Sequence, residues 1–182
     1  MSQKLFMIML GCRPENRITE QHDLFFGIAE KVEDLRPAME QFWPEGKHNL
    51  HIDVWREVTH VEGYKVVIDS TEQSADQLFF VNLGGYQRGV FDELHLKLLV
   101  AAPTIDAAVS QAKKTDFFSR NGFPGASAHI DEKFAFDVDG VDRVADLLGR
   151  CGFPGRRIAL KKTGSDFCDE IHCGYFPLKK MS

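Results

Sequence analysis

Features that mark several familiar classes of protein are missing from this sequence of 182 residues. No stretch approaches the roughly 18 to 20 uninterrupted apolar residues of a membrane helix, so no membrane association is expected. The apolar run at residues 5–10 is shorter than the core of a secretory signal, which favours a first strand and a cytoplasmic protein. Lysine and arginine are scattered and the net charge is -5, so no nucleic-acid partner is expected.

Cysteine is also sparse. The four cysteines include no CxxC pair, and a disulfide framework is not expected in a chain without an export signal. A zinc site built from Cys168, His172 and Cys173 is a weaker alternative to free thiols, because the remaining Cys151 has no near partner in the sequence. No GxGxxG or Walker pattern follows the early glycines, so a nucleotide site has little support. The sequence identifies no cofactor and assigns no metal ligand.

What the sequence does contain is an internal repeat. When the sequence is aligned with itself at a displacement of 73 residues, LFMIMLGC at 5–12 falls on LFFVNLGG at 78–85. In the same alignment, the motif ExH (glutamate, any residue, histidine) at 20–22 falls on the ExH motif at 93–95; we call such short motifs words. With five more residues inserted, HID at 51–53 falls on HID at 129–131. We interpret this colinear series as a tandem duplication. The first copy is assigned to residues 1–72 and the second to residues 73–182.

Hydrophobic periodicity predicts the elements within each copy. Apolar runs that end in glycine predict two strands joined by a polar loop of roughly eight residues. A helix follows, near 34–43 in the first copy and from residue 105 in the second, where Thr104 is the candidate cap. In the first copy, two further strands flank a turn at Glu62-Gly63. The predicted order is therefore β, β, α, β, β.

The second copy departs from this order after Gly140. There, residues 141–148 have helical spacing, residues 157–160 are read as a strand, and the tail at 169–178 adds a final strand. The expected fold class is α+β, with a small ββαββ module that is compatible with a β-grasp or a similar roll. Each module alone is too small for a generous core, so we expect the two to pack as one pseudo-symmetric body.

A family resemblance rests on several of these words. KLFMIMLGC, TEQHD, the FWP after the first helix and HIDVWREV, followed by a second partial copy, resemble the bacterial family called domain of unknown function 1543. The module of that family occurs once or twice per chain, and the resemblance covers about residues 4–148. It implies a soluble bacterial protein. It implies no activity and supplies no catalytic residue.

Five of the seven histidines lie in repeated words, and this distribution is the strongest indication of a functional site in the sequence. In an extended strand, side chains at i and i+2 point to the same face, so each ExH or HxD word places a carboxylate beside an imidazole. A third ExH word, at 170–172, lies in the tail. The candidate ligand-binding residues are Glu20, His22, Glu93, His95, His51, Asp53, His129 and Asp131.

Three hypotheses remain open for these residues. In the first, the copies pack face to face and the repeated residues line a shared cleft for a polar small molecule or a protein partner. In the second, a metal-assisted hydrolase uses the four residues of the two ExH words, since such groups are typical ligands of Zn²⁺ or Mn²⁺ and can act as acid and base. In the third, the repeated residues only satisfy buried hydrogen bonds, or the function lies at an oligomer interface. Substrate and oligomeric state are not determined by the sequence.

Overall fold

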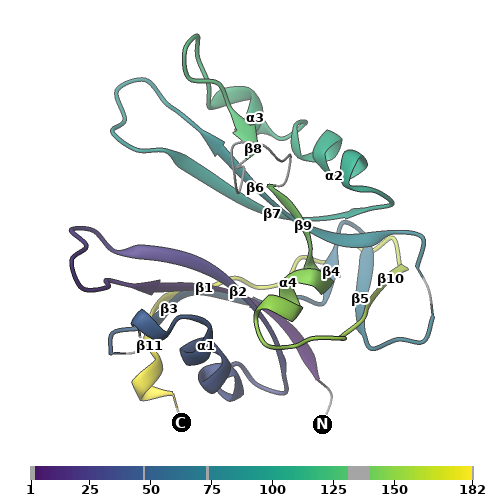
Figure 1. Ribbon diagram of the computed structural model, residues 1–182. Coiled ribbons are helices and arrows are strands. Elements are labelled where there is room, and N and C mark those ends of the chain that lie inside the picture. Colours follow the sequence, from purple (N-terminus) through teal and green to yellow (C-terminus); the bar gives the residue numbers. More distant parts are fainter. Residues whose placement is uncertain (1–2, 47, 73, 131–139, 182) are drawn as a thin grey trace.

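The computed structural model describes residues 3–46, 48–72, 74–130 and 140–181. Two antiparallel sheets form two arms that diverge from a junction (Figure 1). Helix α1 lies on the outer side of the first arm, and α2 and α3 lie on the outer side of the second. The inner faces of the sheets are therefore turned toward each other.

The first arm is a sheet of strand order β11-β3-β1-β2. Side chains alternate across β1, so that Ile8 and Leu10 are completely buried in the core shared with α1 while Met9 points to the inner face. The helical segment begins with a 3₁₀ turn, and Pro37 is tolerated because it lies in the first turn of α1. The elements are β1 (Lys4–Cys12), β2 (Gln21–Ala29), η1 (Val32–Leu35), α1 (Arg36–Phe42), η2 (Pro44–Gly46), β3 (His51–Glu57), β11 (His172–Pro177) and η3 (Leu178–Lys180).

The second arm is built on β6, which pairs with β7 along one edge and with β8 and β9 along the other. Phe79, Val81 and Leu83 are buried with the alanines of α2 in a second core. The side chain of Thr104 accepts a hydrogen bond from the Ala107 amide, which caps α2. The elements are β6 (Gln77–Gly85), β7 (Leu94–Ala102), α2 (Ile105–Ala112), α3 (Asp116–Arg120), β8 (His129–Ile130) and β9 (Val141–Arg143).

The junction is a third sheet of order β10-β5-β4, together with α4. The turn between β4 and β5 has positive φ at Glu62 and Gly63, and the Glu62 carboxylate accepts a hydrogen bond of 2.9 Å from the Ala101 amide of β7. This bond ties the junction to the second arm. The elements are β4 (His60–Val61), β5 (Tyr64–Ile68), α4 (Val144–Arg150) and β10 (Ile158–Lys162).

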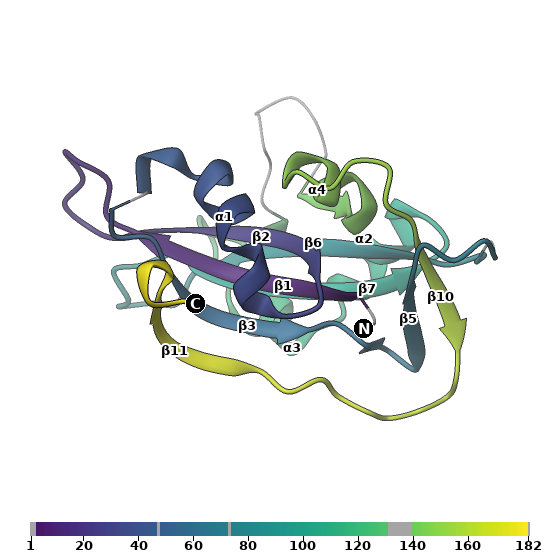
Figure 2. The same cartoon turned by 90° about the horizontal axis from the view of Figure 1, so that it is seen from below.

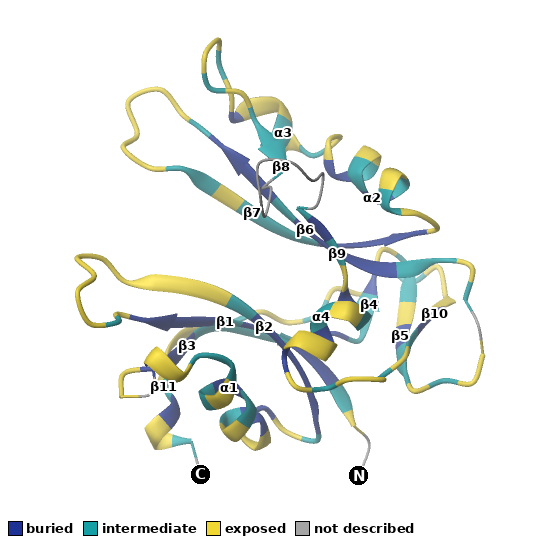
Figure 3. Cartoon of the chain, in the orientation of Figure 1, coloured by how far each residue is buried: buried dark blue, intermediate teal, exposed yellow. Residues whose placement is uncertain are grey.

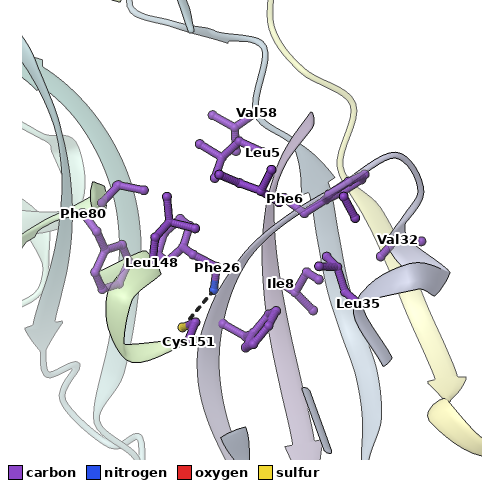
Figure 4. Close-up of a cluster of buried hydrophobic side chains, with 14 of the residues drawn as sticks. Leu5, Phe6, Ile8, Phe26, Val32, Leu35, Val58, Phe80, Leu148 and Cys151 are labelled. Atoms are coloured by element: carbon purple, nitrogen blue, oxygen red, sulfur yellow. Dashed lines mark hydrogen bonds between the residues drawn. The ribbon is translucent and has the colours of Figure 1, made fainter. Parts of the chain in front are cut away.

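One large apolar cluster joins the first arm to the junction and to the base of the second arm. Phe26 of β2 packs edge-on against Phe80 of β6, with 6.0 Å between ring centroids, and Leu148 and Cys151 close the cluster (Figure 4). Burial is concentrated near the junction, whereas the loops at the tips of both arms are exposed (Figure 3). The arms therefore share a core at one end.

The α+β class is confirmed, and so are the pairs β1–β2 and β6–β7. The hairpin expected across the Glu62-Gly63 turn is wrong for β3, because β3 pairs with β1 and β11 and only the short strand β4 pairs with β5 at that turn. The loop between β1 and β2 and the loop between β6 and β7 each contain eight residues, at 13–20 and 86–93, as expected. The registers also agree, because Lys4 pairs with Ala29 in the first arm and Gln77 with Ala102, each displaced by 73 residues, in the second. Both strand pairs thus have the same geometry.

Some predictions differ from the structure. The helix expected from residue 141 begins only at Val144, because residues 141–143 extend as β9 and pair with β6. The short helix α3, which Thr115 caps, was not predicted. Strand β10 does not substitute for a strand of the second copy but pairs with β5, and the tail strand β11 joins β3. None of the helices in the described part of the chain has the length and apolar character that a membrane crossing demands.

Candidate functional site

A cleft of about 850 Å³ lies between the two arms. Both ExH words of the repeat line it, and so does Asp53, so five of the eight predicted residues meet at one cleft. The lining residues of the first arm are Met9, Glu20, Gln21, His22, Asp23, Leu24, Asp53 and Val54. Those of the second arm are Phe80, Asn82, Asp92, Glu93, His95, Lys97, Gly140 and Asp142.

The cleft is strongly acidic. Six carboxylates line it, against a single lysine, Lys97. Carboxylates from both arms take part, since Glu20, Asp23 and Asp53 lie on one side and Asp92, Glu93 and Asp142 on the other. An excess of one charge in a concave site concentrates the field there, so the cleft attracts cations.

Two histidines and two carboxylates of the first arm form a closed ring of contacts at its side of the cleft. His51 Nε2 lies 3.0 Å from Glu20 Oε1 and 3.3 Å from Asp53 Oδ1. His22 Nε2 lies 3.2 Å from Asp53 Oδ2 and 3.7 Å from Glu20 Oε2. Each carboxylate therefore bridges the two imidazoles through its two oxygens.

Strand pairing explains why these residues meet. Gly11 of β1 pairs with His22 of β2 on one side and with His51 of β3 on the other, so both histidines flank one glycine. The register of β3 shifts next to this pair, which leaves Asp53 without a partner in β1. Such bulges re-aim side chains, and here Asp53 turns to the same face as the histidines.

The glycine is sterically required. A Cβ added to Gly11 would lie 2.3 Å from Asp53 Oδ2 and 2.6 Å from His51 Nε2, which is closer than such atoms can approach. The carboxylate and the imidazole therefore occupy the space above the glycine. No other residue type at this position is compatible with the ring.

His51 is held in one orientation. Its Nδ1 lies 2.9 Å from the carbonyl oxygen of Asn49, to which a protonated Nδ1 donates a hydrogen bond. The ring of Tyr175, from β11, covers the imidazole with 4.3 Å between centroids, and only 2% of the His51 side chain is exposed. Among the described residues, the buried Nε2 has no hydrogen-bond partner of good geometry, and neither has Asp53 Oδ2.

The second arm repeats part of this arrangement. His129 Nε2 lies 3.0 Å from Glu93 Oε1, and His129 Nδ1 lies 3.1 Å from the carbonyl oxygen of Ser127. Tyr86 donates a hydrogen bond of 2.7 Å to Glu93 Oε1 and stacks near the His129 ring. His95 and His129 both pair with Gly84, as the first-arm histidines pair with Gly11. Asp131 lies outside the described residues.

The third ExH motif, at 170–172, and the cysteines near it do not line the cleft. His172 of the third ExH word stacks on Trp55, with 4.1 Å between ring centroids, and its ring nitrogen lies 3.8 Å from Glu170. Cys151 is buried, whereas Cys168 and Cys173 are exposed. The zinc site considered for the tail is not formed, since no three His, Cys, Asp or Glu side chains of the described ranges are arranged as a metal centre.

Neither buried cysteine is suited to nucleophilic chemistry. Burial raises the pKa of the Cys12 thiol, and the negative charges of Glu20 and Glu45 raise it further. Burial raises the pKa of the Cys151 thiol to about 11. Both are therefore thiols at neutral pH, and the thiolate is the reactive form.

Sequence reasoning missed several residues of the site. Lys97 and Asp142 lie outside the repeated words, and no pattern in a single sequence singles them out. Tyr175 was missed because β11 reaches His51 only through the tertiary fold. Ile18 and Phe91 do not line the cleft, but both are exposed in the loops at the arm tips and are also separated by 73 residues.

Comparison with known proteins bears on the family and the fold. The family model described as Domain of Unknown Function (DUF1543) matches residues 17–68. The resemblance to this family expected from the sequence is therefore confirmed over these residues. The matched segment contains all four residues of the ring: Glu20, His22, His51 and Asp53.

A solved structure resembles the whole chain. The crystal structure of a protein Il1583 from Idiomarina loihiensis superposes with a TM-score of 0.60 at 21% identity, over 98% of this chain and 99% of that one. At this identity the similarity concerns the fold alone. No curated protein matches the chain.

Proposed function

We propose that this protein is a two-armed binding module for a positively charged small molecule, which it takes into the cleft between the arms. The observation that carries the proposal is the convergence of six carboxylates from both arms on one cleft with a single lysine. Ligand sites of several hundred Å³ with a few convergent polar groups are typical of small-molecule binding. A protonated amine or a guanidinium group would be recognised by these carboxylates.

An apolar surface beside the cleft narrows the proposed ligand further. Met9, Leu24, Val54 and Lys97 line both the acidic cleft and an adjoining pocket of about 190 Å³. The remaining residues of that pocket are Met7, Trp55, Arg56 and Ile171. A ligand with an alkyl chain between amino groups would place methylenes on this surface and its charges among the carboxylates. Alkyl diamines and polyamines have this chemistry.

We further propose that the arms arose from two copies of one module, with the boundary near residues 72 and 73. The common register of β1–β2 and β6–β7 supports this origin, as do the glycine-centred histidine pairs. Two copies facing each other would explain why one cleft receives both ExH words. The proposed module acts in the bacterial cytoplasm and has no nucleic-acid partner.

Titration of the full chain with spermidine tests the proposed function. Isothermal calorimetry should detect binding that weakens as salt is added, because exposed charge interactions are screened. Backbone amides around Glu20 and Glu93 should shift in NMR spectra. The double variant Glu20→Gln/Glu93→Gln should weaken binding at least about tenfold, equivalent to about 1.4 kcal/mol. The variant Asp116→Asn is the matched control, because this exposed carboxylate lies on α3 outside the cleft. Equal binding of succinate, or shifts elsewhere, would contradict the proposal.

The architectural hypothesis predicts a different result. If the ExH histidines only supported the fold, His22→Ala would cost more than about 2 kcal/mol of stability, as broken buried networks do. His22 is 47% exposed, so we expect a loss below about 0.5 kcal/mol, typical of surface positions. Urea denaturation of the wild type and of His22→Ala measures the difference in their free energies of unfolding. A large loss would favour the architectural hypothesis.

A further inference from the structure

We infer that the ring in the first arm is a binding site for one divalent transition-metal ion, with Zn²⁺ as its reference ligand. The inference goes beyond the proposed function. The site shares Glu20, His22 and Asp53 with the cleft but is formed by one arm alone, so Zn²⁺ binding is tested separately from spermidine binding. Its four ligands are Glu20, His22, His51 and Asp53.

The buried imidazole carries the argument. Because Nδ1 of His51 faces the carbonyl oxygen of Asn49, the neutral ring has its proton on Nδ1 and its lone pair on Nε2. That lone pair lies 3.0 Å from one carboxylate oxygen and 3.3 Å from another. Three electron-rich groups in contact repel one another unless a positive charge lies among them. Either a proton or a metal ion supplies that charge.

A metal ion accounts for more of the geometry than a proton. A proton on His51 Nε2 would satisfy that nitrogen alone, whereas one ion can be shared by all four side chains, including His22 Nε2 and Asp53 Oδ2, which lie 3.2 Å apart. In a tetrahedral site with bonds of about 2.0–2.2 Å, neighbouring ligand atoms around one ion lie about 3.3–3.6 Å apart. The four contacts in the ring, at 3.0, 3.2, 3.3 and 3.7 Å, lie close to this spacing, so small side-chain movements would bring the donors around one ion. One ion would therefore engage both imidazoles and both carboxylates.

The ring needs only local adjustment to enclose an ion. Its donors touch one another in pairs and do not yet surround a common centre, in agreement with the absence of a formed metal centre among the described residues. Glu20 is partly exposed and so is His22, so both side chains can turn, whereas His51 is fixed. The missing side chain of Gly11 allows Asp53 and His51 to lie close above the strand, where they face each other.

The donor chemistry defines the class of ion. Imidazole nitrogen suits zinc, copper, iron and nickel, and carboxylate oxygen completes such sites. Magnesium and calcium prefer sets made only of oxygen donors. The backbone contact at Nδ1 of His51 is the kind of interaction that fixes a histidine ligand for a metal. We therefore expect Zn²⁺ to bind more tightly than Mg²⁺.

Calorimetry of the full chain with zinc chloride tests the site. The protein is first dialysed against a chelator and then into chelator-free buffer at pH 7.5. We expect one equivalent of Zn²⁺ to bind with a Kd of about 10 μM or tighter. The variant His22→Ala should lose this equivalent or weaken it at least about tenfold. His22 is partly exposed, so this variant should remain folded.

The matched control is His172→Ala, which removes a partly exposed histidine from the same sheet but outside the ring. It should change the Zn²⁺ affinity less than about twofold. Nitrogen-15 NMR gives a second readout, because Zn²⁺ should shift the Nε2 resonances of His22 and His51 while Nδ1 of His51 stays protonated.

Three outcomes would overturn the inference. The first is the absence of any Zn²⁺ equivalent with a Kd below about 100 μM. The second is equal affinity in wild type and His22→Ala. The third is a metal-free His51 that is doubly protonated at pH 7.5 and does not respond to Zn²⁺, because a proton then fills the role assigned to the ion.

Discussion

His51 and His129 occupy equivalent positions in the two arms but differ in their surroundings. Each has its Nδ1 near the carbonyl oxygen two residues earlier, and each has its Nε2 at 3.0 Å from a glutamate. Yet His51 is 2% exposed, whereas His129 is 39% exposed. The motif HID, at 51–53 and at 129–131, therefore contains a buried histidine in one arm and a partly exposed histidine in the other.

The difference comes from the strands around each histidine. Strand β3 has seven residues and lies between β1 and β11 (Figure 2). Its histidine is covered by Tyr175 of β11. The described part of β8 has two residues and pairs with β6. The chain after β10 runs along the molecule to place β11 on the first arm. The two equivalent histidines therefore differ in burial because β11, a segment distant in the sequence, covers only His51.

The largest expected effect tests whether the arms are energetically independent. Phe26→Ala removes a fully buried ring that packs on Phe80 of the other arm, and such changes cost about 3–5 kcal/mol. Hydrogen exchange should accelerate in β6 and β7 as well as in β1 and β2. The exposed Phe91→Ala is the control and should change stability by less than about 0.5 kcal/mol. Unchanged protection in β6 and β7 would show independent arms.

A pH effect tests the junction between the arms. Cys151 lies against β2, and its sulfur accepts a hydrogen bond of 3.4 Å from the Phe26 amide. Burial raises its pKa from about 9 in the unfolded chain to about 11, so between these values the unfolded chain loses the proton first. The free energy of unfolding should therefore fall as pH rises through this window, by up to about 2–3 kcal/mol.

Urea denaturation at pH 8 and at pH 10.5 measures this loss. The variant Cys151→Ala is the control, because it retains the other titrating groups and lacks only this thiol. We expect its stability to fall less over the same range. Equal losses in both proteins would mean that Cys151 titrates normally at the junction.

Substitution of Gly11 should disrupt the ring around the buried His51 and leave the open His129–Glu93 pair of the second arm intact. In Gly11→Ala the new methyl overlaps Asp53 and His51, and overpacking of this kind costs about 1–3 kcal/mol. The variant should also lose its Zn²⁺ equivalent in calorimetry. Gly149→Ala is the matched control, since a Cβ there meets no described atom within 4 Å and alanine favours the helix by about 0.5–1 kcal/mol. Equal stability of the two variants would refute the steric argument.

The smallest expected effect would make the two histidines more alike. Tyr175→Ala removes the ring above His51, and an aromatic contact contributes about 0.5–1.5 kcal/mol. Diethyl pyrocarbonate should then modify His51 at a rate closer to that of His129, as peptide mass spectrometry would record. Phe176→Ala changes the adjacent partly exposed residue and should leave the His51 rate unchanged. A protected His51 in Tyr175→Ala would show that β11 is not the decisive cover.

Much of the local structure was predictable because it depends on short-range patterns. The apolar runs that end in glycine gave β1 and β6, and Thr104 marked the start of α2. The start of α4 was predicted three residues too early, because pairing with β6 holds residues 141–143 in a strand. Helical spacing alone carries no information about such a partner strand.

The candidate site was predictable only in part. Both ExH words were expected near one cleft, and they line one. The contact of Glu20 with His51 was not predicted, because 31 positions separate these residues and β1 lies between β2, which Glu20 precedes, and β3. The inward turn of Asp53 depends on a register shift, which follows from how β3 meets β1.

The sequence by itself determined the α+β class, the order of the first strands and helices, and the spacing of carboxylates and imidazoles along each strand. These follow from side-chain periodicity and capping, which act over a few residues. Only the tertiary structure decided that β10 and β11 join the sheets of the amino-terminal half and that His51 is buried while His129 is open. Burial is set by which distant segments pack together, and no short word specifies them.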